Sequence, residues 1–430
     1  MSTLYTGGYV VTMDDAGTEH EDGWLLERDG LVAAVGAADP PEADSRTDLN
    51  GALVTPGFVN THHHLYQSLT RARSQQADLF TWLKELYPVW ARLDAEAEHA
   101  AAKYGLAELM TSGCTTVFDH HYVFPRGEDG LIEAEMTAAE ELGVRLVPSR
   151  GSMDLGESDG GLPPDSLVEK PDDVLADTER LAALYPGLVV APCSPFSVTG
   201  QLMRDSAELA RRLGLRLHTH LAETIEEEDY CRELYGCRPV EYLEELGWLE
   251  GDVWCAHCVH LSDDDVAAFG SKRVGVAHCP TSNLRLGAGI ARVRELLDAG
   301  APVGLGVDGA ASNERGDLSF EVKQALLVAR ARGGPTALTA RESLRLATRG
   351  GAAVLGRDDI GSLEPGKSAD FAIWDDEWLF SGAEDPVAAL VFGGPSTVAG
   401  LVVRGRHVLE NVVEHEIVRE HRKAAARFES

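Results

Sequence analysis

The chain has 430 residues, with 38 Lys and Arg against 70 Asp and Glu, which gives a formal net charge of −32. Charge of this sign and size repels nucleic-acid backbones and anionic membrane surfaces, so it argues against both as partners, and it is compatible with a small, neutral substrate. The apolar share of 44% is that of a folded protein, and the length suits one large domain with an appendage or two to three domains.

The sequence also bears on the compartment. The seven cysteines form no short framework, and the first residues lack a basic start followed by an apolar run. We therefore expect a reduced, cytoplasmic protein without a secretory signal. The longest uncharged stretch, Leu181–Met203, contains three prolines, so it predicts a loop and a buried strand and no transmembrane helix.

The N-terminal segment, residues 1–54, contains short runs of alternating character. Gly8–Met13 and Leu31–Gly36 have this pattern, and Asp29-Gly30 supplies a tight-turn signal between them. We therefore predict β-strands here.

Between residues 55 and 357, short β-branched runs alternate with longer Ala-, Leu- and Glu-rich stretches. The longer stretches, such as Ala95–Ser112, place apolar residues at the three- and four-residue spacing of a helix. Strands that alternate with helices predict a parallel sheet, and eight units over about 250 residues favour a TIM-like (β/α)8 barrel over a doubly wound open sheet. The eight runs are Leu53–Asn60, Thr115–His121, Val144–Ser152, Leu188–Ser197, Arg216–Glu223, Asp252–His260, Arg273–Asn283 and Pro302–Asp308.

Residues 358–430 return to short β runs, including Phe371–Trp374 and Thr397–Val403, before the charged tail His415–Ser430, which is typical of a terminal helix or a frayed end. Both β-rich ends flank the barrel. We therefore predict an α/β protein in which residues 1–54 and 358–430 form one small β-sandwich domain beside a catalytic barrel at residues 55–357.

Polar side chains fall where the predicted barrel strands end, which is where barrel proteins carry their functional residues. Three histidines follow the first run, of which His62 and His64 share a face of the strand. The fifth run carries His220 near its end, the sixth carries His257 and the eighth ends in Asp308. A lone strand histidine is more often a hydrogen-bonded core residue, but four such groups together predict a divalent-metal site with room for water.

Other metal and redox motifs are weaker. Cys255 and Cys258 have C-x-x-C spacing, but residues three apart on a strand point to opposite faces and no second pair occurs, so we predict packed free cysteines. The zinc signature of cytidine-type deaminases is absent, because Pro192-Cys193-Ser194-Pro195 lacks its pattern.

At these residues the chain resembles the amidohydrolase superfamily along nearly its whole length. Thr55–His64, Val307–Ser312 and Gly361–Asp370 resemble its first-strand motif, its eighth-strand motif and its return to the sheet domain. The metal ligands that this resemblance implies are His62, His64, His220 and Asp308. It also implies that His257 assists at the site and that the protein forms a homodimer or a larger homo-oligomer.

The end of the fourth strand bears on the number of metals. Superfamily members with two metals usually bridge them through a carboxylated lysine there, whereas this chain has Ala191–Pro195. The resemblance therefore implies one zinc ion per chain. Fe²⁺ and Mn²⁺ remain alternatives, since His/Asp sites accept them as well.

Glu223 extends the resemblance to the chemistry. Thr219–Glu223 resembles the deaminase pattern in which this glutamate shuttles protons, and it implies catalytic roles for Glu223, His257 and Asp308. The stretches His64–Arg71 and Trp82–Trp90 resemble the 8-oxoguanine deaminases and related hydroxytriazine aminohydrolases. The implied reaction is hydrolytic deamination of an amino-substituted nucleobase, 8-oxoguanine to urate and ammonia, with isocytosine as a further substrate.

Two alternatives stay open. One is a hydroxytriazine aminohydrolase, or a deaminase of guanine or another amino-heterocycle, because members with similar barrels take different rings. The remote one is a metal-free scaffold. Metal analysis separates the scaffold from the enzymes, and ammonia release separates the enzymes.

Several residues are candidates for substrate contact. Gln67 occupies the place where guanine deaminases carry a base-binding glutamine, so the resemblance implies that it binds the ring. Arg150, at the end of the third run, could pair with a ring carbonyl or form a surface ion pair. Trp82 and Trp90 could cover the ring or pack in the core. The residues whose roles stay open are His120, His121, His278 and Cys193.

Overall fold

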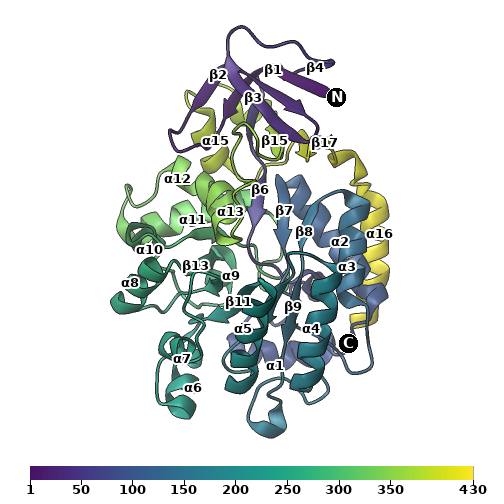
Figure 1. Cartoon of the computed structure of the whole chain (residues 1–430), viewed down its shortest axis with the longest axis vertical. Coiled ribbons are helices and arrows are strands. Elements are labelled where there is room, and N and C mark those ends of the chain that lie inside the picture. Colours follow the sequence, from purple (N-terminus) through teal and green to yellow (C-terminus); the bar gives the residue numbers. More distant parts are fainter. Residues whose placement is uncertain (430) are drawn as a thin grey trace.

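The computed structural model describes residues 1–429, and its centre is the predicted barrel (Figure 1). Every strand pair in the barrel is parallel, and the order is β8-β7-β6-β14-β13-β12-β11-β10-β9. The strands are β6 (Phe58–Asn60), β7 (Cys114–Phe118), β8 (Arg145–Val147), β9 (Ser149–Ser152), β10 (Val189–Pro192), β11 (Arg216–Leu221), β12 (Val253–His257), β13 (Gly275–His278) and β14 (Val303–Leu305).

The third barrel strand is broken. The row of strands begins with β8 and ends with β9, and only Pro148 separates these two segments in the sequence. Proline has no N–H to donate to a neighbouring strand, which suits an interruption of the ladder. The nine segments therefore occupy eight barrel positions, and the fold prediction of a (β/α)8 barrel is confirmed.

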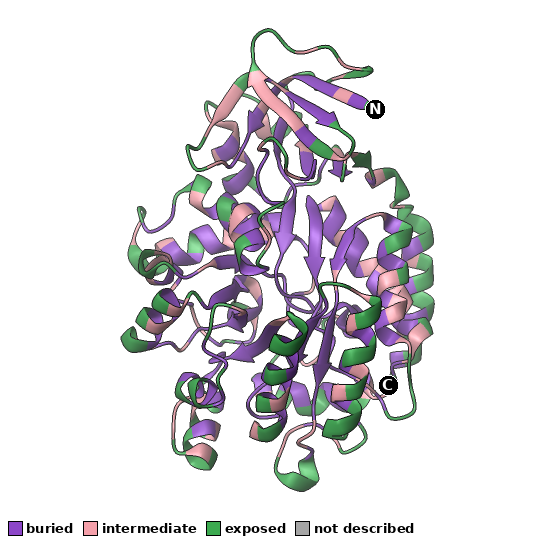
Figure 2. Cartoon of the chain, in the orientation of Figure 1, coloured by how far each residue is buried: buried purple, intermediate pink, exposed green. Residues whose placement is uncertain are grey.

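Helices surround the barrel, with buried inner faces and exposed outer faces (Figure 2). None of the described helices is both long and apolar enough to cross a bilayer. The helices of the barrel region are α1 (Leu79–Trp90), α2 (Ala95–Thr111), α3 (Leu131–Leu142), α4 (Pro171–Leu184), α5 (Gly200–Leu213), α6 (Ile225–Tyr235), α7 (Pro239–Glu245), α8 (Asp263–Lys272), α9 (Pro280–Arg285), α10 (Val293–Ala299), α11 (Leu318–Gly333), α12 (Ala340–Arg345) and α13 (Gly351–Val354).

The two ends of the chain meet in one mixed sheet, at the top of Figure 1. Its order is β17-β16-β15-β5-β1-β2-β3, with β4 beside β1. Its strands are β1 (Ser2–Val11), β2 (Glu19–Arg28), β3 (Leu31–Ala37), β4 (Ser45–Asp48), β5 (Leu53–Pro56), β15 (Phe371–Trp374), β16 (Gly400–Val403) and β17 (Arg406–His407). The antiparallel pairing of β5 with β15 joins the two termini, and β5 leads directly into β6, so the sheet anchors the first barrel strand.

Within residues 1–429, three α-helices follow the barrel. They are α14 (Glu377–Phe380), α15 (Pro386–Gly393) and α16 (Glu414–Ala425). The last of these packs along α2 rather than on the sheet (Figure 1). Its His421 ring stacks on Tyr104 at 4.1 Å between centroids, which fixes the terminal helix against the barrel wall.

Candidate metal and catalytic site

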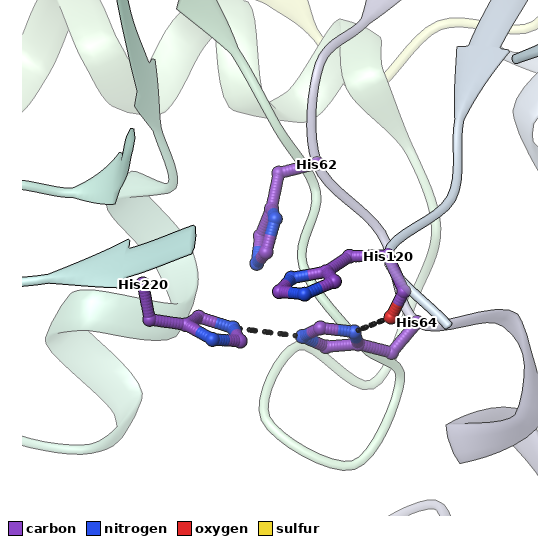
Figure 3. A group of neighbouring side chains, drawn as sticks. All are labelled: His62, His64, His120 and His220. Atoms are coloured by element: carbon purple, nitrogen blue, oxygen red, sulfur yellow. Dashed lines mark hydrogen bonds between the residues drawn. The ribbon is translucent and has the colours of Figure 1, made fainter. Parts of the chain in front are cut away.

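The four predicted metal ligands converge at the carboxyl ends of three barrel strands. His62 and His64 follow β6, His220 lies in β11 and Asp308 follows β14. All four residues are buried. Figure 3 shows the three imidazoles facing one another, with His120 beside them.

The hydrogen bonds of His64 and His220 fix their tautomers. Nδ1 of His64 lies 2.7 Å from the His120 carbonyl oxygen, and Nδ1 of His220 lies 2.7 Å from the Cys193 carbonyl oxygen. A carbonyl only accepts, so each Nδ1 carries the proton and each Nε2 presents a lone pair. The two Nε2 atoms are 3.1 Å apart, where two lone pairs repel unless a cation lies between them.

His62 obtains the same tautomer through a relay. Nδ1 of His218 donates to the Trp254 carbonyl at 3.0 Å, so Nε2 of His218 is an acceptor. Nδ1 of His62 donates to that atom at 2.9 Å, and Nε2 of His62 is left without a hydrogen-bond partner. His218 therefore orients the predicted ligand His62 through a hydrogen bond to the far side of its ring. Residues behind metal-binding histidines commonly have this role.

Asp308 supplies the carboxylate. Its Oδ1 lies 3.4 Å from Nε2 of His62 and 3.3 Å from Nε2 of His64, while Oδ2 accepts from Ser282 at 2.6 Å. Burial alone raises the pKa of Asp308, but its contacts with His62 and the other nearby imidazoles outweigh burial and hold that pKa well below its ordinary value. The carboxylate is therefore ionised at neutral pH.

This donor set fits a divalent metal. Burial lowers the pKa of His62 and of His64 to about 3, so both rings are neutral and able to bind through Nε2. Donor separations of 3.1 to 3.4 Å match ligands that each lie about 2.0–2.2 Å from one tetrahedral ion. Three imidazole nitrogens and one carboxylate oxygen are a set that zinc accepts.

Glu223 and His257 lie next to these ligands. Oε2 of Glu223 is 3.6 Å from Nε2 of His257, and Nε2 of His257 is 3.9 Å from Oδ2 of Asp308. Nδ1 of His257 donates to Oδ1 of Asn283 at 2.8 Å, which orients the ring. Burial raises the pKa of Glu223 to about 7. Burial opposes protonation of His257, but Glu223 and Asp308 raise the pKa of this imidazole.

The backbone is strained at these positions. Ala222, His257 and Asp308 have φ values of 50°, 69° and 61°. Non-glycine residues adopt this left-handed conformation at a cost of about 1–3 kcal/mol, which the surrounding structure must offset. The strained residues lie at the turns that direct Glu223, His257 and Asp308 inward. Strained backbone of this kind is common at active sites.

A pocket opens over the ligands. Trp82, Leu83 and Tyr87 of α1 cover it, and Gln67 and Tyr122 lie on its walls. The other residues that line it are His64, Leu79, Cys193, Phe196, His220, Glu223, His257, Leu286, Asp308 and Ser312.

Gln67 is placed to contact a substrate. Its side chain is buried, and Oε1 has no hydrogen-bond partner. A Cβ at Gly309 would lie only 1.9 Å from Oε1, so the glycine after Asp308 makes room for this amide. Gln67 therefore presents a buried amide at the wall of the pocket.

Arg150 does not reach this pocket, which corrects its predicted place at the substrate. It lies in β9, and its guanidinium points outward to Glu169 at 2.6 Å and to Asp177 of α4 at 2.7 Å. Alternate strand residues face opposite sides, and the outer face of β9 is the one that Arg150 occupies. The alternative of an ion pair is the one that the structure shows, with Arg150 buried and both acidic partners partly exposed.

The residues whose roles the sequence left open separate into two groups. Trp82 and Cys193 line the pocket. Trp90 is buried in the core and donates from Nε1 to Thr70 at 3.0 Å, so it packs rather than covers the ring. His278 ends β13, and neither of its ring nitrogens has a hydrogen-bond partner.

His120 was not among the predicted site residues. One of its ring nitrogens lies within 4.8 Å of a nitrogen of each of the three ligand histidines. Nε2 of His120 donates to the Ala191 carbonyl at 2.8 Å, which leaves Nδ1 without a partner. Its position at the end of the second strand run was the only signal in the sequence.

A second buried cluster lies behind the same segment. His121 contacts Glu135 of α3 at 2.7 Å between Nδ1 and Oε1, and Glu98 of α2 is 3.8 Å from the same nitrogen. Asp119 lies beside them and accepts from the Leu65 N–H at 2.7 Å. Among residues 1–429, no lysine or arginine forms an ion pair with these three carboxyls.

Comparison with known proteins defines the class. The model of the Amidohydrolase family matches residues 53–408. The chain belongs to this family of hydrolytic enzymes.

Particular relatives are also similar. The 8-oxoguanine deaminase of Pseudomonas aeruginosa is 46% identical over 95% of each chain. The isoxanthopterin deaminase of an unknown prokaryotic organism is 38% identical over 90% of this chain and 87% of its own. Among solved structures, the zinc complex of the atrazine chlorohydrolase TrzN from Arthrobacter aurescens TC1 has a TM-score of 0.93 and 34% identity over 99% of this chain and 100% of its own.

Proposed function

We propose that the protein is a zinc-dependent deaminase that hydrolyses 8-oxoguanine to urate and ammonia and also accepts isocytosine. The observation that carries the proposal is Glu223, a buried carboxyl with a pKa raised to about 7, in the same pocket as the converging ligands. The 46% identity to an 8-oxoguanine deaminase supports the choice of ring.

One zinc ion would be held by His62, His64, His220 and Asp308. When bound, zinc lowers the pKa of a water molecule from about 15.7 to about 7 and so supplies a nucleophile at neutral pH. We prefer zinc to Fe²⁺ or Mn²⁺ because the TrzN relative is a zinc complex. We also expect a cytoplasmic protein that forms a homodimer or a larger assembly. Light scattering after gel filtration tests the oligomeric state.

The residues of this chain then handle the protons. Asp308 accepts the proton of the attacking water, and Ser282 keeps its carboxylate in place at 2.6 Å. Protonated Glu223 donates to the ring nitrogen beside the amino-bearing carbon, takes the hydroxyl proton of the adduct and passes it to the amino group. The proton held by Asp308 then returns to Glu223 and restores the starting state of both carboxyls. The reaction thus consumes one water and releases one ammonia, while His257 orients the attacking oxygen.

Gln67 would bind the ring during this reaction. The partnerless Oε1 of its amide can accept a ring N–H, and the amide nitrogen can donate to a ring carbonyl or ring nitrogen. The aromatic side chains of Trp82 and Tyr87 would lie along the apolar faces of the ring and exclude water. Such a pocket suits a flat heterocycle with polar edges.

The test is ammonia release with product identification by mass. Zinc-loaded protein is offered 8-oxoguanine, guanine, isocytosine and a hydroxyaminotriazine. We expect the highest kcat/KM with 8-oxoguanine and urate as the product. Turnover of the triazine alone would retain hydrolytic deamination and overturn the substrate, and no stoichiometric zinc would favour a scaffold.

A further inference from the structure

Glu227 lies directly beneath the turn that carries Glu223. Its side chain is fully buried, and its two carboxylate oxygens accept from the N–H groups of Ala222 and Glu223, each at 2.9 Å. Glu227 does not line the substrate pocket. It therefore contacts the backbone of the proposed proton shuttle without access to substrate.

The arrangement departs from ordinary helix capping. Helix α6 begins at Ile225, so Glu227 is its third residue, and glutamate there commonly accepts from the N–H of the N-cap residue. Here the N-cap is Thr224, whose side chain makes no capping bond. Glu227 instead reaches to the two residues before Thr224, so its bonds hold the preceding turn.

The conformation of that turn must be stabilised by contacts with other residues. Ala222 has a φ of 50°, which an alanine adopts only against a steric cost. The Ala222 carbonyl accepts from the N–H groups of Val259 and His260, both at 3.0 Å, in the loop that follows His257. The turn is thus fixed on one side to the His257 loop and on the other to Glu227.

We propose that Glu227 is a positioning residue: its carboxylate holds Ala222 in the left-handed conformation and thereby directs Glu223 at the reacting ring. The inference rests on the proposed function of Glu223. No assigned metal, substrate or catalytic role falls on Glu227 itself.

The first experiment replaces Glu227 by Gln in the zinc-loaded enzyme. Gln keeps one acceptor oxygen but turns an NH₂ donor toward the other N–H, so one bond becomes a donor–donor contact. We expect kcat to fall about 10- to 100-fold, as for residues that orient reacting groups, with KM within about twofold and zinc content unchanged. Glu226→Gln is the matched control, because Glu226 is the exposed neighbour on α6.

A second substitution separates positioning from general stability. Glycine adopts positive φ without strain. After Ala222→Gly, the turn therefore no longer needs the hydrogen bonds of Glu227 to keep this conformation. We expect the Glu227→Gln, Ala222→Gly double variant to recover at least about a third of the wild-type kcat. A loss of kcat that Ala222→Gly does not restore, or a kcat of Glu227→Gln within about twofold of wild type, would overturn the proposal.

A third measurement does not depend on turnover. Hydrogen exchange of the amides of Ala222 and Glu223, followed by mass spectrometry, reports their bonds to Glu227 directly. We expect exchange at least about tenfold faster in Glu227→Gln and unchanged in Glu226→Gln. Equal exchange in all three proteins overturns the positioning role, whereas faster exchange in a protein that deaminates no base rejects only the function of Glu223.

Discussion

Two buried clusters of imidazoles and carboxyls lie on opposite sides of segment 119–121, and they are built for different tasks. At the pocket, the donor atoms of His64, His220 and Asp308 are separated by 3.1 to 3.3 Å, with lone pairs facing one another. Behind the segment, Nδ1 of His121 lies 2.7 Å from Glu135 and 3.8 Å from Glu98. Both clusters could hold a cation by the separation of their donor atoms, so the protonation of their carboxyls is what distinguishes them.

Their electrostatics differ accordingly. The pKa of Asp308 is held well below its ordinary value by the imidazoles that outweigh its burial. Burial raises the pKa of Glu98 and of Asp119 well above their ordinary values, and that of Glu135 to about 8. One cluster therefore keeps negative charge at neutral pH, while the other keeps protons. Both clusters contain histidines and carboxyls. Their packing decides whether the carboxyls are ionised or protonated.

The largest test of this contrast is Asp308→Asn. It removes the carboxylate that both completes the ligand set and accepts the water proton, so we expect kcat/KM to fall at least about 10⁴-fold. Zinc content, measured by plasma mass spectrometry after desalting, should fall below one per chain. Retained zinc and near-normal turnover would show that Asp308 is neither ligand nor base.

Glu223→Gln tests the proton shuttle without disturbing the ligands. The amide cannot transfer a proton, and we expect kcat to fall at least about 10²-fold. Zinc content should remain that of the wild type, in contrast to Asp308→Asn. Activity within a few-fold of wild type would remove Glu223 from this role.

The pH profile gives a smaller effect with a defined sign. Glu223 must be protonated to donate, and its pKa is raised to about 7 by burial, so the active form is depleted as pH rises through that value. We expect kcat to decline above pH 7 by up to about tenfold per unit, and this limb to vanish in the residual activity of Glu223→Gln. A kcat that keeps rising to pH 9 would contradict the assignment.

The smallest effect is expected in the buried cluster of Glu98, His121 and Glu135. Because the Glu98 carboxyl holds a proton, Glu98→Gln replaces it with a group of similar shape and charge. We expect zinc content and kcat within about twofold of wild type, and a Tm within about 2 °C of that of Glu96→Gln, an exposed position on the same helix. Loss of a metal equivalent would show that this cluster, too, binds a cation.

Local patterns were sufficient to predict the barrel and the convergence of the candidate ligands. The periodicity of apolar residues predicted the alternation of strands and helices. Barrel sites lie at the carboxyl ends of strands, and this rule predicted that His62, His220 and Asp308 lie together although they are far apart in the sequence. The same reasoning failed for Arg150, because its position near a strand end did not tell which face its side chain would occupy.

The sequence by itself therefore determined the architecture, the residue types of the candidate metal site and the class of chemistry that the family resemblance implied, since these follow from local period, strand ends and motif. Only the tertiary structure decided the tautomers, through the bonds of His62 to His218 and of His220 to the Cys193 carbonyl. It also decided that Glu227 supports Glu223. Such contacts depend on side-chain direction and sub-ångström spacing, which arise when separate elements pack and have no local pattern of their own.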